Sequence, residues 1–166
     1  MGIPQKPYLL KPGTVFSSLA GNEGRYDVMA ELLKETVEDR KEKLAGVNLI
    51  FARLRRANLN GANLQESRLD RADLRGAWLD MAKLNGANLE GADLKGAWLS
   101  RTDLKGAMGL KVEMLLKVLS LYKVEGLDPT LEAELKTKKP DLFEEPDYLE
   151  YLEASERILE KAEKKK

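Results

Sequence analysis

Apolar residues recur every five positions through the middle of this chain. A leucine stands at each fifth position from Leu49 to Leu104, twelve in all and without a miss. In an α-helix a step of five residues overshoots a full turn by about 140°, so these leucines would scatter around the helix. In a flat strand an odd step would send successive leucines to opposite faces. The spacing therefore predicts a chain that turns a corner every five residues and winds around a central column of leucines.

The other positions of each pentad support this winding. The position two before leucine is alanine in nine of the twelve pentads, with Val47, Ser67 and Thr102 as the exceptions. A small side chain there fits a backbone that bends tightly toward the axis, which predicts a second inward position. Six pentads end in glycine, which adopts corner dihedral angles at little steric cost. The segment RADLRGAWLD at 71–80 returns as GADLKGAWLS at 91–100, so four pentads make one coil of twenty residues.

These pentads resemble the pentapeptide-repeat family, whose A(D/N)LxG pattern is met by ANLNG, ADLRG, ANLEG and ADLKG. The resemblance covers about residues 45–107 and implies a right-handed quadrilateral parallel β-solenoid with one pentad on each face. Twelve pentads make about three coils. Both ends of so short a solenoid would expose leucine and unpaired backbone, so we expect α-helical caps at both ends. The expected fold class is mainly β with helical flanks.

The flanking sequences predict where these caps lie. Downstream of the repeat, Gly109 stands where the thirteenth leucine would be, and the repeat is expected to stop there. Apolar spacing then predicts a helix over 112–123, and Asp128-Pro129 predicts the start of another that runs to about 136. The expected organisation is an extended arm at 1–24, a capping helix at 25–46, the solenoid at 47–107 and a helical cap and association region at 108–166.

Composition argues against several classes of function. The chain has 166 residues with 28 basic and 28 acidic side chains, so its net charge favours neither a nucleic acid nor a membrane as partner. It has no cysteine and no histidine, which removes thiol chemistry, the usual general base and the commonest metal ligand. No catalytic constellation stands out from the repeat, and no apolar run approaches membrane-spanning length. We therefore expect a non-enzymatic cytoplasmic protein with no cofactor and no metal.

Two tryptophans form the first candidate site. Trp78 and Trp98 occupy the same outward position on adjacent coils, and Met81 extends the apolar patch. Stacked outward indoles are typical of protein interfaces, which indicates a partner-binding surface. The alternative is that a terminal helix or the N-terminal arm covers both indoles and makes them part of the fold.

A basic column forms the second candidate. Arg55, Arg75 and Lys95 stack at one outward position, with acidic columns beside them. Interleaved columns of opposite sign usually make a solvated surface that neutralises itself. The alternative is a phosphate- or carboxylate-binding edge centred on Arg53, Arg55 and Arg56, which would make the protein a weak nucleic-acid binder.

Taken together, these features favour a non-catalytic protein–protein interaction scaffold that forms a homodimer through its C-terminal helices. The residues expected to mediate self-association are Tyr148, Tyr151, Leu152 and Leu159. The resemblance implies an alternative, because some pentapeptide-repeat proteins mimic DNA and inhibit type II topoisomerases such as gyrase. That mimicry needs a long acidic rod, whereas residues 47–107 carry ten basic and seven acidic side chains in three coils.

Overall fold

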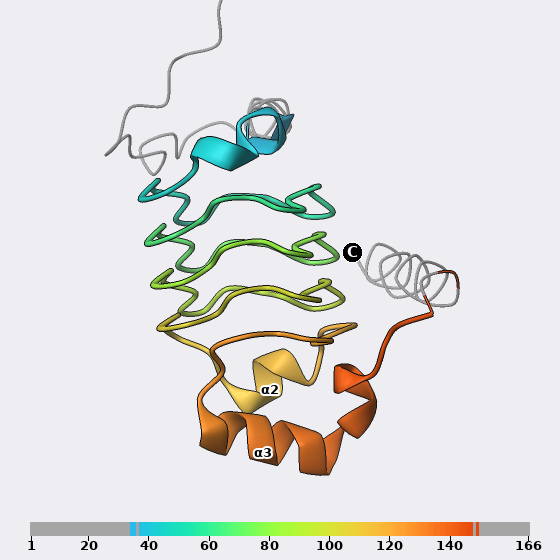
Figure 1. The fold of residues 1–166 in the computed structure, drawn as a ribbon. Coiled ribbons are helices and arrows are strands. Elements are labelled where there is room, and N and C mark those ends of the chain that lie inside the picture. The colour runs from blue at the N-terminus through green and yellow to red at the C-terminus, as the bar shows by residue number, and fades with distance from the viewer. Residues whose placement is uncertain (1–33, 36, 148, 150–166) are drawn as a thin grey trace, which may run out of the picture.

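The protein is a stack of four-cornered coils with helical segments above and below (Figure 1). This computed structural model describes residues 34, 35, 37–147 and 149. Single parallel bridges join residues twenty apart, such as Asn48 with Arg68, so the coils stack in register. Residues 34, 35, 37–39 and 149 are helical, and the helical elements whose bounds are described are η2 (Lys41–Lys43), α2 (Val112–Leu115), α3 (Pro129–Lys138) and η3 (Pro140–Phe143).

Each pentad forms one face of a coil, and each corner is a residue in the left-handed region. A positive φ recurs at every fifth residue without a gap from Gly46 (φ 67°) to Gly106 (φ 69°). Such a φ at the third residue of a β-turn is the signature of a type II turn, which glycine adopts most easily. The three full coils are coil 1 (47–66), coil 2 (67–86) and coil 3 (87–106), and in each coil successive pentads are called faces A, B, C and D.

The interior is the predicted leucine column with a second layer of small residues. Every leucine of the series from Leu49 to Leu104 is at most 1% exposed, and the nine alanines two positions earlier are buried. The two polar members of the small layer make hydrogen bonds to backbone carbonyls. The Ser67 hydroxyl donates to the carbonyl of Leu64, and the Thr102 hydroxyl donates to that of Leu79, each at 2.8 Å. The prediction of two inward positions per pentad is confirmed.

The pentad at 72–76 explains why aspartate or asparagine precedes leucine. Buried or partly buried N–H groups need an acceptor. The N–H of Ala72 closes a corner onto the carbonyl of Leu69 at 3.0 Å, and those of Asp73, Leu74 and Gly76 bond to the adjacent coils at 2.9 Å each. Only the N–H of Arg75 is left over, and the Asp73 side chain accepts it at 3.2 Å. The repeated Asp or Asn therefore supplies the one acceptor that the stacked backbone lacks.

The N-terminal end of the solenoid is capped by helical residues. The N–H of Asn63 donates to the carbonyl of Lys41 at 2.7 Å, and that of Asn58 donates to Oε1 of Glu38 at 2.6 Å. These bonds occupy two N–H groups of coil 1 that have no coil above them. The described helical residues end at 39 and η2 ends at Lys43, so the cap ends before the predicted 46. Residues 1–33 of the predicted arm and helix lie outside the described residues.

The prediction of a helix over 112–123 is wrong beyond Leu115, where α2 ends. The chain instead resumes the solenoid, because Ser120 pairs with Trp98 and Glu125 pairs with Asp103. Leu121 takes the position below the leucine column and is fully buried. An extended path here supplies backbone partners for coil 3 and buries Val118, Leu119 and Leu121. Residues 107–127 therefore form a partial coil 4, beyond the predicted end of the solenoid.

Coil 4 lies close against the backbone of coil 3 at two glycines. Two glycines, Gly109 and Gly126, stand at positions that leucine occupies one coil above. A Cβ at Gly109 would lie 2.5 Å from Cα of Glu90, and a Cβ at Gly126 would lie 2.4 Å from Cα of Lys105. Real Cβ atoms do not come so close to backbone, so these positions exclude every side chain.

Below coil 4, α3 and η3 cover the end of the core (Figure 1). The predicted start of α3 is confirmed, because the Asp128 side chain accepts from the N–H groups of Thr130 and Leu131 at 2.9 and 3.1 Å. This is a helix N-cap, and proline at the first helical position adds to it. Leu135 of α3 and Leu142 of η3 are buried against the core.

Candidate functional site

Face C carries the two tryptophans, and their environments differ. The ring centroids of Trp78 and Trp98 are 6.2 Å apart with an interplanar angle of 33°. Trp98 is only 1% exposed, whereas Trp78 is half-buried and Met81, three residues later at the corner of the same face, is 56% exposed. The prediction that both indoles form an outward patch is therefore wrong for Trp98. What remains at the surface is an edge made by Trp78 and Met81, which we call the Trp78–Met81 edge.

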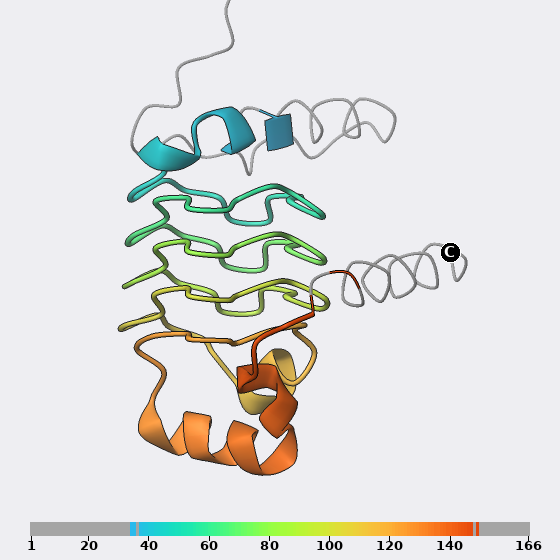
Figure 2. The same ribbon diagram turned by 45° about the vertical axis from the view of Figure 1, so that its right-hand side comes forward.

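The C-terminal part of the chain comes to the same side of the solenoid. The N–H of Leu121, on face C of coil 4, donates to the carbonyl of Leu142 in η3 at 2.6 Å. Beyond η3 the chain turns back toward the level of coil 3 (Figure 2), and Pro146 in this stretch is buried. The alternative weighed for the tryptophans, burial from within the protein, thus applies to Trp98.

Tryptophan at the position before leucine removes the usual side-chain acceptor, and the preceding coil replaces it. The N–H of Asp80 donates to Oδ1 of Asn60 at 3.1 Å, and that of Ser100 donates to Oδ1 of Asp80 at 3.2 Å. Asn60 and Asp80 were not among the predicted site residues. Their signal in the sequence is a polar residue twenty positions before each backbone N–H that a tryptophan leaves without an acceptor.

The position of Asp80 is electrostatically unfavourable for its ionised carboxylate. Burial raises the pKa of its carboxyl, and the hydrogen bonds from Ser100 and the charge of Arg101 offset that rise only in part. The pKa therefore lies above its ordinary value. The aspartate holds the backbone of the next coil, but its ionised form is disfavoured where it sits.

The basic column lies on face B and is neutralised at its centre. The Arg75 guanidinium binds Asp73 through two bonds, Nε–Oδ1 at 2.7 Å and Nη2–Oδ2 at 2.5 Å, and its Nε lies 3.7 Å from Asp93. Burial alone would raise the pKa of Asp73, but the hydrogen bonds and charge of Arg75, with the charge of Arg55, hold it below its usual range. The hydrogen bonds that Arg75 donates to Asp73 in turn raise the pKa of Arg75. Around Arg75 the column is therefore a self-neutralising surface.

The six predicted partner-binding residues do not form one site. Trp78, Trp98 and Met81 lie on face C, whereas the basic residues lie on face B, across the corner from them. Lys95 is exposed and Arg55 is half-buried. The predicted arginine edge is likewise on face B of coil 1, where Arg56 holds a corner with φ 56°.

Several predicted features fall outside the described part or are absent from it. Tyr148, Tyr151, Leu152 and Leu159 lie outside the described residues, although Leu149 between them is helical and 78% exposed. Within the described ranges no group of three acidic side chains could hold a metal ion. No helix of that part is long and apolar enough to cross a membrane.

Comparison with known protein families identifies the same repeat. The family model for pentapeptide repeats matches residues 43–77 and 67–106, with 8 copies. The repeat region belongs to the pentapeptide-repeat family. Pentapeptide repeats fold as right-handed β-solenoids, in agreement with the stacked coils of residues 47–106.

Two solved structures of pentapeptide-repeat proteins are similar to this chain. One is from the thylakoid lumen of Arabidopsis thaliana, with 22% identity over 56% of this chain and 70% of that one and a TM-score of 0.37. The other is HetL from the cyanobacterium Nostoc, described as involved in the regulation of heterocyst differentiation, with 30% identity over 49% of each chain and a TM-score of 0.21. The match therefore spans about half the length of HetL. No curated protein matches the sequence.

Proposed function

We propose that this pentapeptide-repeat chain is a non-catalytic protein-binding scaffold that contacts its partner through the Trp78–Met81 edge. The observation that carries the proposal is Met81, which is 56% exposed and holds a corner with φ 58°. A side chain in the left-handed region costs roughly 1–2 kcal/mol relative to glycine. Because the Met81 side chain is exposed, its burial does not offset this strain energy within the isolated fold.

The other corners of the solenoid differ from the corner at Met81. Glycine fills seven of the thirteen corners between Gly46 and Gly106. Phe51 is as exposed as Met81, but the guanidinium of Arg71 lies 5.5 Å above its ring, so it has a partner within the chain. Met81 is not among the described residues that pack against the core. Next to the rigid, half-buried indole of Trp78, it forms the kind of aromatic and methionine surface that is enriched in interfaces.

The scaffold is also proposed to form a homodimer through its C-terminal region. Leu149 supports this, because a leucine that is 78% exposed on a helical segment has apolar surface to bury. The self-association residues Tyr148, Tyr151, Leu152 and Leu159 belong to the same segment of the sequence. Removing residues 148–166 should halve the mass measured by light scattering, and an unchanged mass would remove the dimer from the proposal.

The two alternatives draw no comparable support. A DNA mimic needs an excess of acidic surface, and the solenoid carries more basic than acidic side chains. A nucleic-acid binder needs cationic groups directed at phosphates, whereas Arg75 at the centre of the basic column is bound to Asp73. Clear inhibition of gyrase supercoiling by the purified protein would reverse this ranking.

The deciding experiment compares two corner substitutions in a pull-down from source-cell lysate. Met81→Gly removes the proposed contact and relieves the left-handed strain, and Glu66→Gly relieves the same kind of strain, at φ 54°, on another corner of the solenoid. Both variants should melt at or slightly above the wild-type temperature. A protein captured by the wild type should be retained by Glu66→Gly and lost by Met81→Gly. Equal capture by both variants would contradict the proposed edge.

A further inference from the structure

Among the described residues, face B of coil 3 is bonded to coil 4 only at its last residue, where the N–H of Gly96 donates to the carbonyl of Lys117 at 2.8 Å. Coil 4 pairs with coil 3 on face A through Met108, on face C through Ser120 and on face D through Glu125. On face B, Asp93 pairs with Asp73 above it and with no described residue below it. The reason is that α2 (Val112–Leu115) takes the place of the fourth pentad of this face, and a helix cannot continue the ladder.

Three backbone groups are left without a partner at this point. One coil higher, the N–H groups of Arg71 and Leu74 donate to coil 3, and the carbonyl of Ala72 accepts from it. The groups at the same positions in coil 3 are the N–H of Gly91, the carbonyl of Ala92 and the N–H of Leu94. No described residue forms a hydrogen bond with any of these three groups. The carbonyl of Ala92 and the N–H of Leu94 are the acceptor and donor that one residue of a parallel strand completes, as Asp93 does for Ala72 and Leu74. The N–H of Gly91 lies at the corner before them, where φ is 69°.

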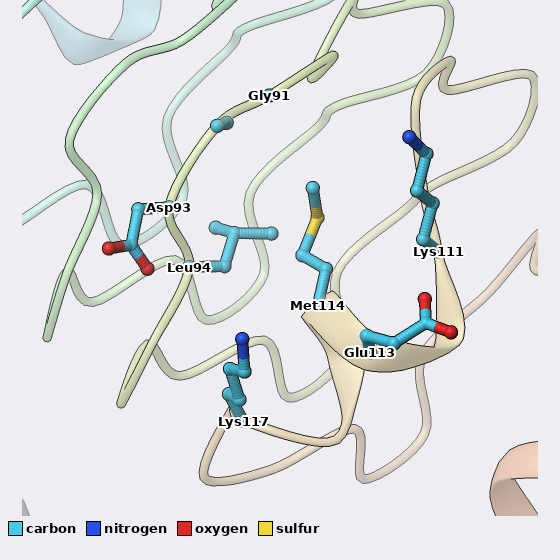
Figure 3. Close-up of a pocket in the computed structure, with 8 residues that line it drawn as sticks. Gly91, Asp93, Leu94, Lys111, Glu113, Met114 and Lys117 are labelled. Carbon is cyan, nitrogen blue, oxygen red and sulfur yellow. The ribbon is translucent and has the colours of Figure 1, made fainter.

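These groups line a cavity of about 360 Å³ between coil 3 and α2 (Figure 3). Its volume lies near the lower end of the range for ligand pockets. Met114 rises from α2 beside Leu94 and forms the apolar wall (Figure 3). The cavity is lined by Gly91, Ala92, Asp93, Leu94, Lys111, Glu113, Met114 and Lys117.

The charges around the cavity favour an acidic ligand. Lys111 precedes α2 and Lys117 follows it, and neither takes part in a salt bridge with a described residue. The Asp93 carboxylate is already engaged, because it accepts from the N–H of Lys95 at 3.0 Å and lies 3.7 Å from Nε of Arg75. Besides Asp93, the lining therefore carries two ammonium groups and one carboxylate, that of Glu113.

We propose that this cavity is a peptide-binding groove, which takes an extended acidic segment of a partner protein as an added parallel strand. The central residue of the peptide donates its N–H to Ala92 and accepts from Leu94, and the preceding part of the peptide accepts from Gly91. Carboxylates toward the two ends of the peptide meet Lys111 and Lys117. Main-chain pairing of this kind supplies affinity in β-strand addition, and flanking side chains supply specificity. This groove is separate from the Trp78–Met81 edge.

Amide hydrogen exchange tests the open ladder in the free protein. The N–H groups of Gly91 and Leu94 should exchange at least about tenfold faster than those of Arg71 and Leu74, which are bonded one coil higher. Equal protection of the two pairs would show that the ladder is closed and would overturn the proposal.

Binding is tested by NMR titration of the full chain with the acetylated and amidated peptide Glu-Val-Thr-Val-Glu. We expect amide shifts and slowed exchange at Gly91 and Leu94. A control peptide with proline in place of threonine lacks the N–H that Ala92 requires, so it should bind about tenfold more weakly. Absence of shifts at about 5 mM peptide, or equal binding of the two peptides, would overturn the proposal.

Paired charge reversals separate the groove from general attraction. Lys111→Glu with Lys117→Glu should weaken peptide binding about tenfold, because both flanking contacts become repulsive. The matched control, Lys83→Glu with Lys105→Glu, makes the same change of net charge on face D and should alter binding by less than about twofold. Equal weakening by both pairs, or self-association that blocks the groove in the wild type, would count against the proposed occupant. Met81→Gly should leave this titration unchanged, so failure of the groove and failure of the Trp78–Met81 edge are distinguishable.

Discussion

The regular coils and coil 4 follow different rules within one continuous solenoid. In the pentad 72–76 every backbone N–H has an acceptor, and the same hydrogen-bond pattern recurs through most of coils 1 to 3. In coil 4 two glycines replace leucine, one face is a helix, and the chain gains two residues between bridge partners, from Trp98 to Ser120. Positions in the regular coils are therefore largely interchangeable, whereas each position in coil 4 has a constraint of its own. The irregular end is also where the structure offers an open ladder and covers a tryptophan.

The largest expected effect contrasts a glycine of coil 4 with a glycine of the regular coils. Gly126→Ala brings a Cβ to 2.4 Å from Cα of Lys105, whereas Gly61→Ala has nothing within 4 Å. Both substitutions add left-handed strain of roughly 1–2 kcal/mol. Only Gly126→Ala adds a backbone clash, so it should lower the free energy of unfolding by about 4 kcal/mol against about 1 kcal/mol for Gly61→Ala.

Urea denaturation monitored by circular dichroism would measure the two losses of stability. Gly109→Ala provides a second test, because its Cβ would lie 2.5 Å from backbone atoms of Glu90. Similar losses for Gly61→Ala and Gly126→Ala would mean that coil 4 is as tolerant as the repeat above it.

A smaller effect should separate the two tryptophans, which share a column but not an environment. Trp98→Ala removes a side chain that is 1% exposed at the seam with coil 4, and should cost about 3 kcal/mol. Trp78→Ala removes a half-buried side chain inside the regular coils, and should cost about 1 kcal/mol. Thermal melting of the two single variants measures this difference, and a greater loss for Trp78→Ala would reverse the assignment of Trp98 to the fold.

The smallest expected effect concerns two aspartates of the regular coils, Asp73 and Asp80, which differ in environment. The pKa of Asp73 is lowered and that of Asp80 is raised, so their contributions to stability have opposite signs. Ionised Asp73 stabilises the fold above the pKa of the unfolded chain, and this contribution is lost as pH falls through its lower folded pKa. Ionised Asp80 is disfavoured in the fold, so stability rises as pH falls through its raised pKa.

Asparagine substitutions measure these two signs. At pH 7, Asp73→Asn should destabilise the fold by about 1 kcal/mol, because Arg75 then loses the negatively charged acceptor of its two hydrogen bonds. Asp80→Asn keeps an oxygen for the N–H of Ser100 and removes the disfavoured charge, so it should stabilise slightly at the same pH. The Asp80 difference should shrink first, as pH falls through its raised pKa, and the Asp73 difference should shrink only below about 4, as pH falls toward its lowered pKa. Urea unfolding at pH 7 and pH 3 provides the measurement, and effects of the same sign at pH 7 would contradict it.

The sequence alone determined the repeating part of this protein, because the interactions there are local or repeat with a fixed period. Leucine and alanine every five residues specified the two inward layers, and Asp128-Pro129 specified the start of α3. Each follows from a side chain acting on backbone within a few residues or one coil away.

Only the tertiary structure decided the course of residues 116–127 and the fate of Trp98. The apolar spacing of 112–123 fits a helix, but coil 3 offers a ladder of N–H and carbonyl groups, and the chain pairs with that ladder instead. Trp98 and Trp78 have the same local sequence, yet Trp98 is buried where coil 4 pairs with it through Ser120, and η3 bonds to the same face at Leu121. A short-range pattern carries no information about contacts between residues far apart in the sequence, so burial and the open groove on face B appear only once the ends of the solenoid are in place.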